Sequence, residues 1–199
     1  MKNEKSKNIL LAVLLVAIVT LTIAYAALSA TLTINATAVV KGNANNWKVE
    51  FVKTPATTCV ASNYASVETQ PTISATAFTG LVAHFKAPGD KVTCTWNVEN
   101  NGQIDAYLKT FTKPSTYNYS GASGDVDKVT GKINYTLTYS NDTAITAGTS
   151  STGDQLPADS TTGKQGLKLV IEFNPNATEL PAADVTVTGF DTIFLYEQK

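Results

Sequence analysis

The sequence contains no arginine, a single histidine (His84) and only two cysteines (Cys59 and Cys94). Its 15 basic residues are therefore all lysines, and 16 acidic residues bring the formal net charge to -1. Nucleic-acid binding depends on clustered cations that neutralise phosphates, so this charge balance argues against a nucleic-acid partner. Without a guanidinium fork, a bidentate phosphate site is also disfavoured. One histidine and two cysteines are too few for a zinc cluster.

Catalytic motifs are missing as well. There is no His-Glu-x-x-His sequence, and Gly121-Ala122-Ser123-Gly124 lacks the Gly-x-Ser-x-Gly pattern of a nucleophile elbow. Four loop acids, Asp125, Asp127, Asp142 and Asp154, do not have the spacing of an EF-hand. We therefore predict a protein that is not an enzyme, with no catalytic residue, no cofactor and no metal site.

The N-terminus has the order of a secretory signal peptide. Three lysines within the first seven residues precede an apolar and threonine run over Ile9–Ile23, and Ala24-Tyr25-Ala26 supplies a small-x-small cleavage sequence. We predict a signal peptide over residues 1–26 and a secreted, extracellular or cell-surface protein. An uncleaved anchor is the alternative, because weakly polar, alanine-rich sequence continues past Ala26 and a membrane span needs about 20 apolar residues.

Export to an oxidising compartment favours a disulfide between Cys59 and Cys94. The alternative is a pair of buried free thiols.

The body of the chain, residues 47–199, shows apolar residues at every second position in several segments, which is typical of half-buried strands. The clearest of these segments are Lys91–Glu99, Ile133–Tyr139 and Leu167–Phe173. Asn101-Gly102 predicts a tight hairpin turn after the first. Pro114–Gly131 and Ser140–Gly166 are polar and predict long loops. We predict an all-β fold, an antiparallel β-sandwich of jelly-roll type.

The segment after the predicted cleavage site, residues 27–46, has the pattern of a long strand joined to the body by a polar link. Its alternate positions are apolar: Leu28, Ala30, Leu32, Ile34, Ala36, Ala38 and Val40. Such an arm can pair within its own sandwich, or it can complete the sheet of a neighbouring copy. A head-to-tail contact of the second kind repeats without closing and makes a filament.

Three parts of the sequence resemble secreted proteins of the TasA/camelysin-like family. Pro88-Gly89-Asp90 leads an alternating strand into Asn100-Asn101-Gly102-Gln103-Ile104-Asp105-Ala106, and both the signal ending in Ala24-Tyr25-Ala26 and the closing Phe194–Gln198 are similar to that family's ends. The resemblance covers about a third of the chain. It implies a jelly-roll subunit of biofilm-matrix fibres, assembled by an N-terminal donor strand over Leu28–Val40.

Five Asn-x-Ser/Thr sequons occur, and two of them, Asn118 and Asn141, lie in predicted loops. We expect these two to be glycosylation sites if the source is an archaeon, whereas most bacteria would leave them unmodified.

Our leading hypothesis is a secreted structural subunit that forms extracellular filaments, a pilus or a biofilm-matrix fibre, by strand donation. Its partner is then another copy of itself in a head-to-tail homopolymer, with membrane contact only through an uncleaved N-terminus or during export. The alternative is a membrane-anchored monomeric domain that binds carbohydrate or another surface partner through Tyr117–Tyr119.

Overall fold

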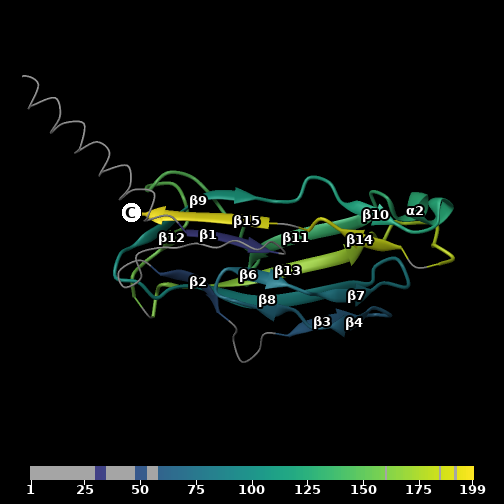
Figure 1. Cartoon of the computed structure of the whole chain (residues 1–199), viewed down its shortest axis with the longest axis horizontal. Coiled ribbons are helices and arrows are strands. Elements are labelled where there is room, and N and C mark those ends of the chain that lie inside the picture. Colours follow the sequence, from purple (N-terminus) through teal and green to yellow (C-terminus); the bar gives the residue numbers. More distant parts are fainter. Residues whose placement is uncertain (1–29, 35–47, 53–57, 160, 184, 191) are drawn as a thin grey trace, which may run out of the picture.

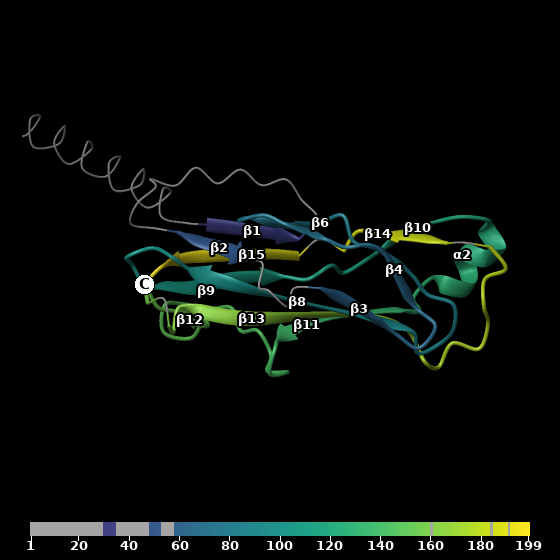
Figure 2. The same ribbon diagram turned by 90° about the horizontal axis from the view of Figure 1, so that it is seen from below.

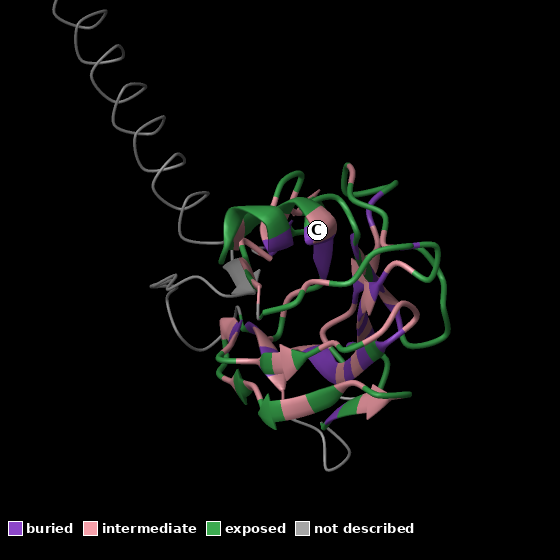
Figure 3. Cartoon of the chain, turned by 90° about the vertical axis from the view of Figure 1, so that its right-hand side faces the viewer, coloured by how far each residue is buried: buried purple, intermediate pink, exposed green. Residues whose placement is uncertain are grey.

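The computed structural model describes residues 30–34, 48–52, 58–159, 161–183, 185–190 and 192–199, with the backbone alone for 30–34. The predicted signal peptide therefore lies outside the described residues, as does the predicted arm apart from 30–34. The prediction of an all-β sandwich is confirmed: two sheets pack face to face, and the buried residues lie between them (Figures 1, 2 and 3). The jelly-roll type stays a prediction.

The first sheet has the strand order β12-β9-β15-β1-β6-β5. These strands are β12 (Gln155–Leu156), β9 (Ala106–Thr112), β15 (Thr192–Gln198), β1 (Ala30–Ile34), β6 (Ala77–Thr79) and β5 (Thr72–Ile73). Every pairing in it is antiparallel except that of β1 with β6, which is parallel.

The second sheet has the order β11-β13-β8, and two short strands share the far edge of β8. Its members are β11 (Ile133–Tyr139), β13 (Lys164–Phe173), β8 (Lys91–Asn100), β2 (Val49–Val52) and β3 (Cys59–Ser62). The three long strands confirm the segments that alternation predicts. Along β8, for example, Val92, Cys94 and Trp96 are buried, while Lys91 is exposed and Thr93 and Thr95 are half-buried.

Two further ribbons extend the first sheet at one end. β10 (Asn118–Ser120) pairs with β14 (Thr186–Thr188), and β4 (Ser66–Thr69) pairs with β7 (Val82–His84). In the chain β10 follows β9 and β14 precedes β15, while β4 precedes β5 and β7 follows β6. The β10–β14 ribbon thus continues the neighbouring strands β9 and β15, and the β4–β7 ribbon continues the neighbouring strands β5 and β6.

The sandwich has two ends, which we call the helix pole and the C-terminal pole. The helix pole carries the short helix α2 (Ser123–Val129) and the turn before β8, and the C-terminal pole carries Lys199 and the 101–105 connection (Figure 1). Helix α2 lies within the predicted polar loop Pro114–Gly131. The sequence prediction missed it.

The predicted tight hairpin at Asn101-Gly102 is wrong. Strand β8 ends at Asn100 in the second sheet and β9 begins at Ala106 in the first, so the connection crosses between the sheets. The buried Asn100 side chain holds this connection: its Nδ2 donates to the carbonyls of Ile104 (2.8 Å) and Leu156 (2.9 Å), and its Oδ1 accepts from Gly102 N (3.0 Å). A side chain thus replaces the cross-strand bonds of a hairpin turn.

Candidate functional site: a strand slot in the first sheet

The central slot of the first sheet, between β15 and β6, is occupied by β1 (Figure 2). All five residues of β1 pair with β15, from Ala30 opposite Tyr196 to Ile34 opposite Thr192. On its other side, Thr33 and Ile34 pair in parallel with Ala77 and Phe78 of β6. The predicted arm thus contains a strand, and in the single chain that strand completes its own sheet.

Four aromatic side chains lie beneath this slot, in the core. Phe78 of β6 and Phe194 of β15 are buried on its two walls, and Phe51 and Trp96 face them from the second sheet. The Phe78 and Trp96 ring centroids are 4.7 Å apart, and those of Phe51 and Phe194 are 5.8 Å apart. Removing β1 exposes apolar surface at this floor, so the sandwich needs a strand here.

The predicted donor residues divide into two groups. Ala30, Leu32 and Ile34 lie on β1, at register positions opposite the buried side chains Tyr196, Phe194 and Thr192. The other four, Leu28, Ala36, Ala38 and Val40, lie outside the described residues. Sequence reasoning did not find the acceptor strands. The alternation in Phe194–Tyr196 is a signal for one wall, but β6 is only three residues long and gives none.

One wall of the slot is braced by a buried carboxylate. Glu197 of β15 accepts a hydrogen bond from the Tyr107 hydroxyl (2.8 Å) and pairs with Lys109 Nζ (2.6 Å), both on β9. Buried charges are tolerated when they are paired in this way, and the pairing links the end of the chain to the neighbouring strand.

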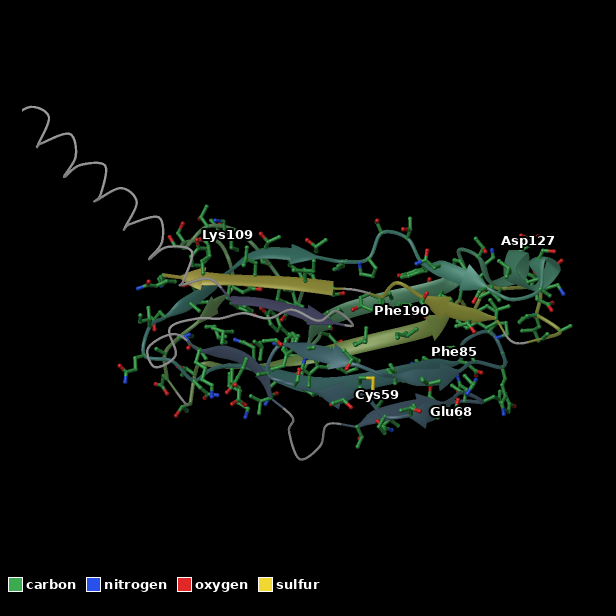
Figure 4. All side chains as sticks on the ribbon, viewed as in Figure 1. Cys59, Glu68, Phe85, Lys109, Asp127 and Phe190 are labelled. Atoms are coloured by element: carbon green, nitrogen blue, oxygen red, sulfur yellow. A yellow bond between two sulfur atoms is a disulfide. The ribbon has the colours of Figure 1, made fainter. Side chains whose placement is uncertain are left out.

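The predicted disulfide between Cys59 and Cys94 is confirmed, and the alternative of two free thiols is wrong (Figure 4). The two cysteines lie directly opposite each other on β3 and β8, and both are buried. The bond fastens the β3–β4 segment to the edge of the second sheet. A buried disulfide is typical of proteins that fold in an oxidising compartment.

The turn that begins β8 is held by the fully buried carboxylate of Asp90. Its oxygens accept hydrogen bonds from the backbone N–H groups of Lys86 (2.7 Å), Ala87 (2.9 Å) and Tyr64 (3.0 Å). Burial raises the pKa of Asp90, but these three backbone hydrogen bonds outweigh it, and the net pKa is lowered from 3.8. Gly89 before it has φ +86°, which explains the glycine in this turn.

The remaining predicted sites lie on the surface. Asn118 is exposed on β10, and Asn141 is exposed in the turn after β11. His84 is exposed on β7, and its Nε2 is 2.7 Å from Glu68 Oε2. Within the described residues, no group of three or more His, Cys, Asp or Glu side chains is placed to hold a metal ion. No helix in that same part of the chain is long and apolar enough to cross a membrane.

The tyrosines of the alternative hypothesis belong to an aromatic cluster. The ring centroid of Tyr117 lies 5.0 Å from that of Phe190, which is labelled in Figure 4. The Phe190 ring in turn stacks on Tyr135, with 6.0 Å between the centroids. The ring of Tyr119 lies edge-on to Tyr117, and its hydroxyl accepts from Gly131 N (3.2 Å). These half-buried rings pack against one another and support the β10–β14 ribbon.

The chain matches no protein-family model, no curated protein and no solved structure.

Proposed function

We propose that this protein is a secreted structural subunit that polymerises into extracellular filaments by donating its N-terminal strand to the next copy. The observation that carries the proposal is the position of β1 in the central slot, between β15 and β6. Only residues 35–47 connect this strand to the body at Lys48. A strand held by a single connection can leave its slot without unthreading any other element.

Exchange of this strand between copies preserves the contacts that the closed chain makes. The arm of a neighbour brings the same backbone hydrogen-bonding groups to β15 and β6 and the same alternation toward the aromatic floor. Because the donor and acceptor surfaces lie on different parts of the subunit, the contact is head-to-tail and continues into a fibre. The predicted signal peptide and the buried disulfide support export to the cell surface.

Negative-stain microscopy of the exported, purified protein tests the proposal, with fibres as the expected result. Deletion of Leu28–Val40 is expected to leave unpolymerised protein. Ile34→Asp is expected to prevent assembly because it places a carboxylate opposite the buried Thr192. The matched control is Thr33→Asp, one residue away on the opposite side of the alternation, which should assemble. Normal fibres from the deletion variant refute strand donation. Absence of fibres from the intact mature protein leaves the monomeric surface domain as the better interpretation.

A further inference from the structure

The slot that β1 occupies continues past the end of β1. Beyond β15 its wall is β14, whose only pairing among the described residues is with β10. Beyond β6 its wall is β7, whose only pairing in that part of the chain is with β4. Each of these strands therefore presents one edge without a strand partner, and each belongs to a two-stranded ribbon, which is marginally stable alone.

The register of β1 projects the rest of the arm between these two edges. Continued from Ile34 opposite Thr192, the antiparallel register brings 38–40 opposite 188–186, which is β14. Continued from Ile34 opposite Phe78, the parallel register brings 38–40 opposite 82–84, which is β7. Two independent pairings thus place the same three residues between the same two strands. The middle residue, Val39, lies opposite Val187 and Ala83, the two wall residues that pack against the core.

Both walls bend at the same level. Gly80 and Gly189 have φ +76° and +88°, and the two registers place them opposite residues 36 and 37. A strand that follows the walls bends with them at this point. With it in place, β10, β14, the arm, β7 and β4 join the first sheet as one continuous surface.

The chain's own arm is too short to do this. Leu32 pairs with Phe194, whose ring lies 5.8 Å from that of Phe51, so Leu32 and Phe51 lie at about the same level. Strands β1 and β2 run in the same direction along the sandwich (Figure 1). At about 3.3 Å per residue, Val40 in the projected strand is then about 35 Å from Lys48. Residues 41–47 must bridge that distance, but eight Cα steps reach at most about 29 Å.

We propose that residues 35–40 of a second copy bind between β7 and β14, as the continuation of the strand that fills the slot. The proposal rests on the proposed function and specifies its acceptor surface. It also fixes the polarity of the contact. Since the donor strand leaves the slot at the helix pole of the acceptor, Lys48 and the C-terminal pole of the donor lie against that helix pole.

Intermolecular cross-linking tests the proposal with two cysteine variants that are mixed before assembly and then oxidised. One preparation carries Val39→Cys and the other Val187→Cys, which the projected register places opposite each other. A covalent dimer is expected from the mixture and not from Val39→Cys mixed with Thr95→Cys, a control on the outer face of the second sheet. A second mixture, Thr31→Cys with Leu195→Cys, reports on the part of the slot that β1 occupies.

The outcomes separate the two claims. Dimers from both mixtures support the acceptor surface. Dimers from Thr31→Cys with Leu195→Cys alone leave strand donation standing and overturn the binding of residues 35–40 between β7 and β14. Dimers from neither mixture overturn both. A double variant Val39→Cys/Val187→Cys that cross-links within one chain also overturns the proposal, because its own arm then reaches β14.

Lengthening the link supplies a second test that needs no cysteine. Eight Gly/Ser residues inserted after Asn45 add about 26–29 Å of reach, enough for the chain's own arm to fill the slot to Val40. Monomers are then expected to replace fibres in size-exclusion chromatography and microscopy. The same insertion between Ser150 and Ser151, in an exposed turn, should leave fibres unchanged. Unchanged fibres from the lengthened link overturn the argument from reach.

Discussion

Replacing Asp90 by asparagine is expected to destabilise the helix pole strongly, although the change removes only one charge. The carboxylate accepts three backbone hydrogen bonds while fully buried. A hydrogen bond to a charged group contributes about 1.5–3 kcal/mol, and a buried donor left without a partner costs about 1–3 kcal/mol. In the Asp90→Asn variant the new amide NH₂ faces backbone donors at one of the two oxygen positions, so at least one bond is lost. We expect a loss of about 2–4 kcal/mol.

Urea denaturation at pH 7, followed by tryptophan fluorescence, measures this loss. In thermal unfolding, at about 2–4 °C per kcal/mol for a chain of this size, the melting temperature should fall by about 5–15 °C. Asp127→Asn is the matched control, since Asp127 lies on α2 near the surface and the same charge is removed. A difference below about 1 kcal/mol between Asp90→Asn and wild type refutes the assigned role.

The pH dependence of stability provides a second check on the role of Asp90. The pKa of Asp90 is lowered in the folded protein, so its contribution to stability is present above the ordinary carboxyl pKa and is lost as the pH falls through the folded value. The stability difference between wild type and Asp90→Asn should therefore be constant from pH 7 to about pH 5 and shrink in acid. A difference that grows in acid contradicts the lowered pKa.

Two further predictions concern the connections that hold the sheets. The double variant Cys59→Ser/Cys94→Ser should lower the free energy of unfolding by about 3–4 kcal/mol, because the disulfide joins residues 35 positions apart. Urea titration of this variant and of the wild type, with and without reductant, measures the loss. An unchanged midpoint contradicts the prediction. Asn100→Ala should lower the free energy of unfolding by about 2–4 kcal/mol, because the Ile104 and Leu156 carbonyls and the Gly102 N–H lose their hydrogen-bond partner. The control Asn101→Ala changes an exposed side chain and should cost less than about 1 kcal/mol in the same assay.

Alternation predicted which residues of a strand face the core but not which strand lies beside it. The pattern over Lys91–Glu99 correctly gives β8, but the Asn101-Gly102 turn signal after it wrongly suggested that the next strand, β9, is its hairpin partner. Both strands are half-buried whichever sheet they join, so a period of two carries no information on pairing. The buried Asn100 side chain stabilises the connection that crosses from β8 to β9. One of its hydrogen-bond partners, the Leu156 carbonyl, lies 56 positions away in the sequence.

Short elements were missed for a different reason. Helix α2 has seven residues, too few for a clear helical period, and it is held by Asp125, which accepts from the distant Ala182 and Ala183 N–H groups. Leu156 is buried although it lies within the mostly polar segment Ser140–Gly166. Strand β1 was predictable because the alternation around it is long. The proposed acceptor surface was not, because it is assembled from three- and seven-residue strands far apart in the sequence.

In the proposed fibre the Ala30–Ile34 strand makes the same pairing as in the closed chain, so those contacts cancel when the two states are compared. What remains in favour of the fibre is the pairing that residues 35–40 gain and the contact between the poles. A change at Leu32 therefore weakens both states, while one at Val39 weakens the fibre alone. Val39→Pro, which removes a backbone donor from a central strand, should abolish fibres and leave a folded monomer with an unchanged melting temperature. Ala44→Pro in the link should still assemble, and fibres from Val39→Pro would show that the gain lies elsewhere.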